Sequence, residues 1–234
     1  MDKTRTELML GKSATERLAL AHVAVFGVGG VGGFATEALA RAGVGRLTLI
    51  DSDKVAPSNI NRQIIATAST VGRVKVDVMR ERVLDINPDA IVTAREVFYS
   101  EQTRDTFNFA DFDYVVDAID SVKSKVDLIV TAKAHGVPII SAMGAGKKLD
   151  PTQFLVDDIK NTSVCPLARA VRTALKKQGV DSLKVVYSKE TPVPPPADAP
   201  DMGGDNAPGS VSFVPSVMGL IIAGEVIKDL AKKD

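Results

Sequence analysis

The feature that most constrains the fold is a glycine-rich turn between an apolar run and a helical pattern. Residues 22–28 predict a buried strand, and residues 30–42 predict a helix with small residues near its start. Between them stand Gly27, Gly29, Gly30 and Gly32. Glycines at this spacing permit a tight turn, and they let a phosphate approach the free N–H groups at a helix amino terminus. The pattern therefore predicts an α/β, Rossmann-like fold with a nucleotide site at the turn.

Strand and helix patterns continue to alternate after this turn. Further strands are predicted at residues 46–51, 91–97, 114–119 and 137–142, and helices at 71–86 and 124–135. Such alternation is typical of a doubly wound, mainly parallel sheet covered on both faces. We interpret residues 20–146 as a nucleotide-binding core.

The pattern changes after residue 146. Two added strands, at 152–158 and 183–188, flank a predicted basic helix at 167–178. Residues 191–209 are rich in Pro, Gly, Asp and Ala and lack a periodic apolar pattern, so they predict a mobile loop. The chain closes with a helix at 214–232, with one apolar face formed by Val217, Leu220, Ile221, Gly224 and Ile227. We expect one domain over residues 1–234.

Composition narrows the function classes. Lys plus Arg equals Asp plus Glu, 29 each, so a nucleic-acid partner would need a local basic patch. The single cysteine, Cys165, excludes an internal disulfide and a cysteine-rich structural zinc site. With no signal peptide in the sequence, this favours the cytoplasm. Residues 217–223 are shorter than the roughly 20 residues of a membrane span, so we expect no membrane segment.

Charged residues after the turn separate two kinds of nucleotide enzyme. Asp51 ends the second predicted strand, where a carboxylate can accept ribose hydroxyls, and this alone leaves a nicotinamide or flavin enzyme open. Arg62 and Lys75 follow it, and Asp120 follows another strand. Cations balance charge on phosphoryl oxygens, and a carboxylate at a strand end can hold Mg²⁺. Each residue alone is typical of a protein surface, but the set predicts a site that cleaves ATP between its α- and β-phosphates.

Four motifs carry a resemblance to a known superfamily. They are Gly27-Val-Gly-Gly-Val-Gly, Leu49-Ile-Asp-Ser-Asp, Ser58-Asn-Ile-Asn-Arg-Gln and Val71-Gly-Arg-Val-Lys. In these the chain resembles the ThiF/MoeB/HesA superfamily of ubiquitin-activating-type adenylyltransferases. The resemblance implies that a substrate carboxylate attacks the α-phosphate of ATP, giving an acyl-adenylate and pyrophosphate.

The resemblance also implies roles for individual residues. Asp51 would bind the ribose, with Asp53 and the four glycines in the same ATP site, and Asp120 would coordinate Mg²⁺. The phosphates would be held by Asn59, Arg62, Gln63 and Lys75. Arg5 matches an arginine that family members donate to the neighbouring subunit's ATP site, which implies a homodimer. On the residues alone, Arg5 would belong to a flexible tail. The implied catalytic residues are Arg5, Arg62, Lys75 and Asp120.

Over nearly its whole length the chain resembles one branch, the tRNA threonylcarbamoyladenosine dehydratases. The features that carry this likeness include Asp117-Ala-Ile-Asp-Ser-Val, Gly144-Ala-Gly, Leu149-Asp-Pro-Thr-Gln, Asp158-Ile-Lys-Asn-Thr and Val186-Tyr-Ser-Lys-Glu. This branch implies ATP-dependent cyclisation of the threonylcarbamoyl group on adenosine 37, in the tRNA anticodon loop. Residues 147–234 would then be the substrate-facing and dimerisation part.

Two features of the late half stay open. Basic residues cluster there, and they fit either a tRNA backbone or a solvated helix face. They are Lys147, Lys148, Lys160, Arg169, Arg172, Lys176, Lys177 and Lys184. Cys165 fits either an acyl acceptor or a non-essential thiol, and we favour the thiol because no His or second Cys lies nearby.

Two other functions compete with the tRNA enzyme. One is activation of a ubiquitin-like sulfur carrier that ends in Gly-Gly, and the other is a nucleotide-responsive binding module without catalysis. A sulfur-relay protein is a further candidate partner.

Overall fold

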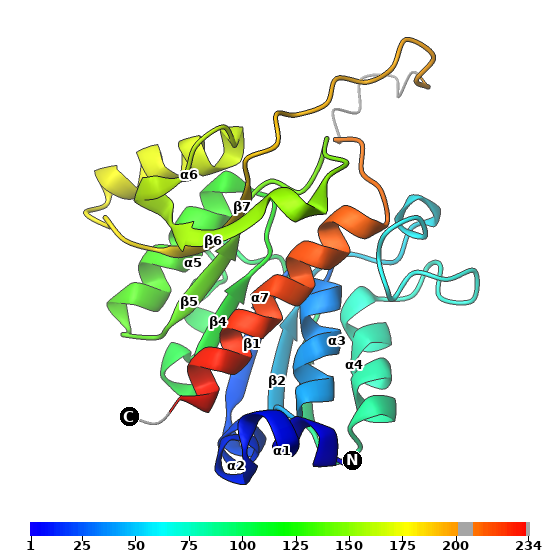
Figure 1. The fold of residues 1–234 in the computed structure, drawn as a ribbon, viewed down its shortest axis with the longest axis vertical. Helices are drawn as coiled ribbons and strands as arrows, with labels where there is room; N and C mark the ends of the chain where they lie inside the picture. Colours follow the sequence, from blue (N-terminus) through cyan, green and yellow to red (C-terminus); the bar gives the residue numbers. More distant parts are fainter. Residues whose placement is uncertain (201–207, 233–234) are drawn as a thin grey trace.

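A seven-stranded sheet in the order β3-β2-β1-β4-β5-β7-β6 runs through the centre of the molecule (Figure 1). The computed structural model describes residues 1–200 and 208–232. Neighbouring strands are parallel except β6 and β7, which are antiparallel. The strands are β1 (His22–Phe26), β2 (Arg46–Ile50), β3 (Ile91–Arg95), β4 (Tyr114–Asp117), β5 (Ile139–Ala142), β6 (Phe154–Asp158) and β7 (Lys184–Ser188). The predicted Rossmann-like, mainly parallel sheet with added late strands is confirmed.

The direction of winding reverses beside β1. The chain runs from β1 outward to β2 and β3, and then returns to add β4 on the other side of β1. Every residue of β1 and β4 is buried, as expected for strands covered on both faces. Because the flanking connections diverge here, a crevice opens beyond the carboxyl ends of β1 and β4, where open α/β sheets bind ligands.

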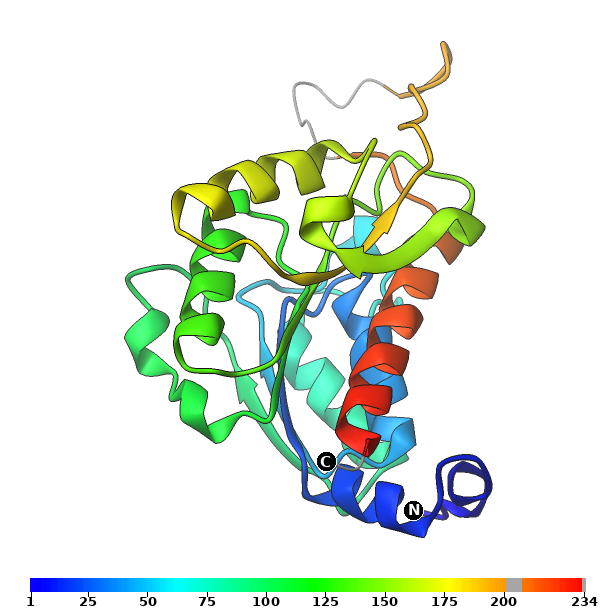
Figure 2. The ribbon, with the colours of Figure 1, turned by 60° about the vertical axis from the view of Figure 1, so that its left-hand side comes forward.

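Helices cover both faces of this sheet, as Figures 1 and 2 show. On one face lie α3 (Gly32–Ala42), α4 (Lys75–Ile86) and α7 (Phe213–Ala231), and on the other lie α5 (Val122–Ala134) and α6 (Pro166–Lys177). Each face has its own cluster of buried apolar side chains. The described 3₁₀ turns are η1 (Pro57–Asn59), η2 (Arg104–Thr106), η3 (Phe109–Asp111), η4 (Pro151–Gln153) and η5 (Ile159–Asn161). Within the described ranges, no helix combines the length and apolarity that crossing a bilayer requires.

The last helix was placed correctly, and the face that it buries differs from the apolar face that the sequence spacing identified. The side chains that pack into the core are Val214, Met218, Ile222, Ala223 and Val226, and the predicted face is only partly covered. The helix is apolar on most of its circumference, so apolar spacing alone does not decide which face is inside. Its inner face packs closely on α3, beside Gly219.

The first twenty residues form two short helices, where a flexible tail was expected for Arg5. They are α1 (Thr4–Leu10) and α2 (Lys12–Leu20), separated by Gly11 at a φ of 83°. α2 contributes Leu18 to the core, whereas α1 buries no residue of its own. The Leu8 and Met9 side chains of α1 are 80% and 84% exposed.

The helix predicted from residue 71 begins four residues later, at Lys75. Gly72 has a φ of 86°, which does not fit a right-handed helix, and Val74 makes an isolated antiparallel bridge to Lys54. Residues 71–73 therefore form a turn and a bend before the helix. This shift places Lys75 in the first turn of α4.

The late segment predicted as a mobile loop is described only in part. Residues 191–200 and 208–209 contain no helix or strand, and residues 201–207 lie outside the described residues. Lys147, at a φ of 57°, joins the two ends of this segment through its backbone. Its N–H donates to the carbonyl of Gly209, and its own carbonyl accepts from the N–H of Val193, each at 2.8 Å.

Candidate functional site

A cleft of about 760 Å³ opens beyond the carboxyl ends of β1, β2, β4 and β5. The glycine turn, the end of β2 and the turn after β4 form part of its lining. Much of the remaining lining of the cleft comes from residues 142–148, 165–167, 208, 210 and 215. The described parts of the late segment therefore border the same cleft as the glycine turn.

The glycine turn has the shape that a phosphate-binding loop requires. Gly27 has a φ of 89°, and a Cβ there would lie 2.6 Å from the carbonyl oxygen of Ala118. A Cβ on Gly32 would lie 1.8 Å from the carbonyl oxygen of Gly27. No other residue fits either position without moving the backbone. Gly27, Gly29 and Gly30 line the cleft, whereas Gly32 lies behind them and serves packing.

The start of α3 offers hydrogen-bond donors to this cleft. The N-cap residue, Val31, provides no side-chain acceptor. Among the described residues, the N–H groups of Gly29, Gly30 and Val31 have no backbone or side-chain acceptor. Free N–H groups and the positive end of the helix dipole together favour an anion here.

Asp51 connects the end of β2 to the glycine turn. Its Oδ2 accepts the N–H of Val28 at 2.8 Å, and its Oδ1 accepts the N–H of Asp53 at 2.9 Å. The carboxylate lines the cleft and keeps further lone pairs for ribose hydroxyls. Its position is the one that the spacing from the glycines predicts for a ribose-binding acid.

Two predicted cations and one amide lie in the cleft wall. The Lys75 residue is only 5% exposed, and its Nζ lies 2.8 Å from Oδ2 of Asp53. The half-buried Arg62 donates to the carbonyl of Ser58 at 2.9 Å. The buried Oε1 of Gln63 has no hydrogen-bond partner among the described residues. Two cations beside a glycine turn suit a ligand that brings several phosphate oxygens. The Oε1 of Gln63 is an acceptor and would need an N–H or O–H donor instead.

Asp120 lies in the turn between β4 and α5 and faces the cleft. It is exposed, and no hydrogen bond or ion pair joins its carboxylate to another described residue. The described residues contain no group of three His, Cys, Asp or Glu that could hold a metal alone. A lone carboxylate fits Mg²⁺ nevertheless, because Mg²⁺ commonly takes one or two carboxylates, substrate phosphates and water.

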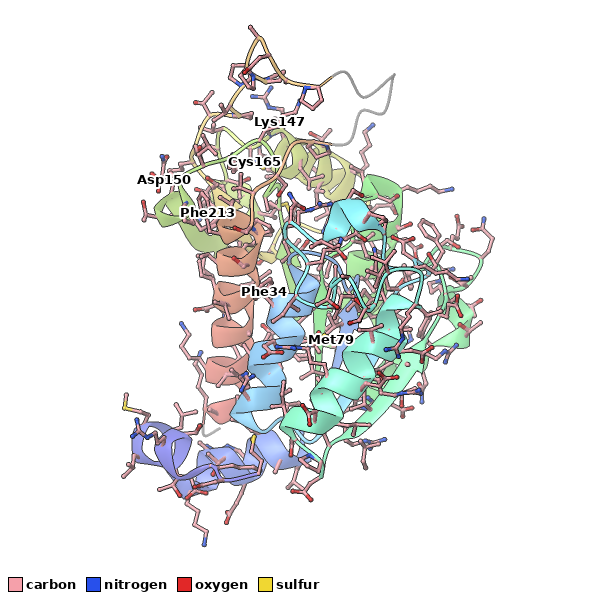
Figure 3. All side chains as sticks on the ribbon, turned by 90° about the vertical axis from the view of Figure 1, so that its right-hand side faces the viewer. Phe34, Met79, Lys147, Asp150, Cys165 and Phe213 are labelled. Carbon is pink, nitrogen blue, oxygen red and sulfur yellow. The ribbon has the colours of Figure 1, made fainter. Side chains whose placement is uncertain are left out.

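Two of the predicted site residues lie outside the lining of the cleft. Asn59 is buried outside the cleft lining, and its Oδ1 accepts the N–H of Ala56 at 3.0 Å, which closes a 3₁₀ turn. Arg5 belongs to α1, and this helix lies at the opposite end of the molecule from Lys147 and Cys165 (Figure 3). It lines a separate groove between α1, α3 and α7.

Sequence reasoning missed an aromatic part of the cleft. Val97, Phe98 and Tyr99 follow β3 and line the cleft, with Phe98 56% exposed. The hydroxyl of Tyr99 donates to Asp127 at 2.9 Å, and burial raises the pKa of Tyr99 above its usual range. Because these residues follow a parallel strand, the rule that strand ends share one edge was the signal that pointed to them.

Cys165 also lines the cleft and is buried. It is the N-cap residue of α6, and its Sγ would lie 3.5 Å from a Cβ on Gly144. The thiol therefore packs beside the turn that follows β5.

The basic cluster of the late half divides into two groups. The side chains of three members contact other residues of the protein. Lys148 donates to the carbonyl of Glu190 at 2.7 Å, and Arg172 donates to the carbonyl of Thr162 at 3.0 Å. Lys184 forms ion pairs with Glu225 and Asp229. The other five are exposed: Lys147, Lys160, Arg169, Lys176 and Lys177. We call these five residues the basic surface.

Comparison with known proteins agrees with this site. The model of the ThiF family matches residues 3–234. The chain belongs to the ThiF family. It is 46% identical over 239 residues to the tRNA threonylcarbamoyladenosine dehydratase of Bacillus subtilis, covering 98% of this chain and 94% of that protein. The superfamily and the branch that the motifs indicated are both confirmed.

Solved structures show the same relationship. The E. coli tRNA N6-threonylcarbamoyladenosine dehydratase TcdA in complex with ATP is 35% identical, with a TM-score of 0.88, covering 97% of this chain and 92% of that chain. Its complex with AMP has a TM-score of 0.89 at 36% identity and the same coverage. The relatives of this fold thus include an enzyme captured with both nucleotides.

Proposed function

We propose that this protein is an ATP-dependent tRNA threonylcarbamoyladenosine dehydratase. The observation that carries the proposal is the joining of the glycine turn, Arg62, Lys75 and Asp120 in one cleft at the point where the sheet reverses. Relatives that match nearly the whole chain bear this name. The competing activation of a Gly-Gly carrier has no comparable support.

The geometry suggests how the residues act. The free N–H groups of the glycine turn and the Arg62 and Lys75 cations hold the triphosphate, and Asp51 holds the ribose. The carboxylate of the threonylcarbamoyl group attacks the α-phosphorus, and the bond to the β-phosphate breaks, releasing pyrophosphate. A nucleophile within the modification then attacks the acyl carbon, loses its proton and displaces AMP, so that a ring closes. The chain's contribution is orientation and stabilisation of phosphate charge.

Asp120 would hold Mg²⁺ in this site. Bound beside the nucleotide, the ion would neutralise charge that develops on the departing pyrophosphate. Asp53 already pairs with Lys75 at 2.8 Å, so Asp120 is the carboxylate left available for the metal.

We also propose that the protein acts as a homodimer. Exposed apolar side chains on α1 lie near the groove between α1, α3 and α7, which Phe34, Leu220 and Ile227 line together with Arg5. A second copy seated there would cover this apolar surface. Arg5 lies far from its own cleft, which fits a role in the ATP site of the partner.

The basic surface would bind the anticodon stem and loop of the tRNA. Among the described residues, the side chains of these five cations make no hydrogen bond and no ion pair. Lys147 and Cys165 both lie at the cleft end of the molecule in Figure 3. Contacts of this kind weaken as the salt concentration rises, because the release of counterions from the nucleic acid then becomes less favourable. We place the reaction in the cytoplasm, and a sulfur-relay partner stays a prediction.

The test is the reaction itself. Enzyme, ATP, Mg²⁺ and tRNA that carries threonylcarbamoyladenosine are incubated, and the digested nucleosides are analysed by mass spectrometry. We expect the modified nucleoside to lose one water while AMP and pyrophosphate appear. AMP release that depends on a Gly-Gly carrier, and not on tRNA, would support the competing function instead.

A further inference from the structure

A fully buried lysine connects two of the turns that line the cleft. The side chains of Lys125 and Asp117 are both 0% exposed, and Nζ lies 2.8 Å from Oδ2. The same Nζ donates to the carbonyl of Ala142 at 3.0 Å and lies 3.3 Å from Oγ of Ser141. Three acceptors therefore match the three N–H groups of the ammonium.

On one side these contacts lead to Asp120. Oδ1 of Asp117 accepts the N–H of Ile119 at 3.1 Å, and Ile119 is the residue directly before Asp120. The backbone N–H of Lys125 donates to the carbonyl of Ser121 at 2.8 Å, directly after Asp120. Lys125 therefore bonds to both ends of the turn that carries Asp120. Its side chain bonds to Asp117 before the turn, and its backbone N–H bonds to Ser121 after Asp120.

On the other side the contacts lead to the turn after β5. Ala142 is the last residue of β5, and Met143 to Gly146 follow it along the cleft. The hydroxyl of Ser141 also donates to Asp117, which joins β5 to β4 a second time. One ammonium therefore fixes the separation between the Asp120 turn and the turn at residues 143–146.

The lysine is a costly way to fill this space. A buried charge carries a large desolvation penalty, and apolar side chains of similar volume often stabilise a fold equally well. Apolar side chains cannot bond to three acceptors from separate segments, however. The contacts favour a role in geometry over a role in stability.

We propose that Lys125 is a positioning residue for the adenylation step. Its ammonium group fixes the position of Asp120 relative to the cleft wall at residues 143–146. The reacting phosphate and the charged groups that stabilise it are thereby held in one arrangement. The inference rests on the proposed function, because it concerns the same reaction. Displacements of about 1 Å in a catalytic site can lower turnover about 100-fold.

The test removes the ammonium without leaving an unpaired charge. In the double variant Lys125→Met with Asp117→Asn, the new amide still accepts from Ile119 and still bonds to Ser141. We expect kcat for tRNA-dependent AMP release to fall about 10- to 100-fold. We expect the affinity for AMP, measured by calorimetry, to stay within about threefold, because the glycine turn and Asp51 are untouched.

A matched control lies one residue away on the same strand. Val116 is fully buried in the cluster on the opposite face of the sheet, so Val116→Ala should lower Tm while keeping kcat within about twofold. A second variant, Ser141→Ala, removes one bridging hydroxyl without changing charge and should lower kcat several-fold with unchanged AMP affinity. It carries the test if the double variant does not fold.

The outcomes separate the two proposals. Parental kcat in Ser141→Ala, and in the double variant when it folds, would overturn the positioning role and leave the proposed function intact. The positioning role would also be overturned if Val116→Ala lost kcat in the same proportion to its loss of Tm as the test variants do. The effect would then be general destabilisation. No tRNA-dependent AMP release by the parent enzyme would overturn the proposed function itself, and the positioning role with it.

Discussion

Gly219 is the position at which a single methyl group should disturb both stability and the nucleotide site. A Cβ there would lie 2.3 Å from the carbonyl oxygen of Val31 and 3.0 Å from the backbone N of Ala35. Ordinary contact begins at 3.4 Å, so the overlap with the carbonyl is 3.4 − 2.3 = 1.1 Å. The obstructing atoms are backbone of Val31, the N-cap of α3 within the glycine turn, and of Ala35 in the first turns of α3. Gly219→Ala must therefore push α7 and the start of α3 apart.

The magnitude follows from two opposing effects. Alanine in place of glycine inside a helix stabilises it by about 0.8–1 kcal/mol. Overpacking of a well-packed interior costs about 1–3 kcal/mol, and a clash with backbone belongs in the upper part of this range, about 2–3 kcal/mol. We expect a net loss of about 1–2 kcal/mol in the free energy of unfolding, which for a chain of this length lowers Tm by about 2–8 °C. The KM for ATP should rise as well, since the turn at Gly29 and Gly30 precedes the displaced carbonyl.

Gly224 provides a matched control in the same helix. No heavy atom lies within 4 Å of a Cβ built there, so Gly224→Ala should raise Tm by about 2–4 °C and leave the KM for ATP unchanged. Both variants are measured by calorimetry at equal protein concentrations over a tenfold range, because Tm would depend on concentration in the proposed dimer. Equal increases of Tm in both variants would refute the described contact between α3 and α7.

Three further outcomes are expected. Lys75→Ala should lower kcat/KM for ATP by about 100- to 1,000-fold in the AMP-release assay with Tm nearly unchanged, and a loss below tenfold would contradict its role at the phosphates. Arg5→Ala and Asp120→Ala should each be inactive, and mixed subunits should regain activity through hybrid dimers, whereas no recovery would argue against a shared site. Asp229 is partly buried, which opposes ionisation, but bonds from Lys184 hold its carboxyl pKa below its ordinary value. The resulting stability is present above the ordinary Asp pKa and is lost as pH falls through the lowered one, so Asp229→Asn should flatten the fall of Tm in acid.

The predicted site residues that the structure places along the cleft are local in sequence. The glycine turn, Asp51 and Asp120 each follow a strongly apolar strand, and strand ends in a parallel sheet meet at one edge. Lys75 was identified by its motif, although its helix begins later than the periodicity indicated. Local pattern and tertiary structure agree wherever strands are buried on both faces, because a short, continuous apolar run between turn residues is typical of such a strand.

The missed features depend on contacts between distant segments. Lys125 reads as an ordinary charged residue of a helix, and lysine is rarely fully buried. Its burial becomes understandable only once Asp117 and Ala142 supply acceptors from two strands. α2 buries mainly small or polar residues such as Ala14 and Thr15, so it has little apolar pattern to detect.

Long-range contacts also account for the division of the basic residues. Lys148, Arg172 and Lys184 look like surface cations in the sequence, but each binds an acceptor that is distant along the chain or across the sheet. Composition can count such residues, yet it cannot show which of them the fold itself uses.

The backbone of Lys147 has a consequence for engineering and for the divergence of relatives. One residue bonds to both Val193 and Gly209, through its carbonyl and its N–H, so these two positions are held independently of what lies between them. In general, each doubling of the length of a loop costs only about 0.6 kcal/mol. An epitope, a fluorophore attachment site or a whole small domain inserted between residues 194 and 200 should leave the two Lys147 bonds and the cleft unchanged, so this position suits the attachment of a reporter beside the cleft.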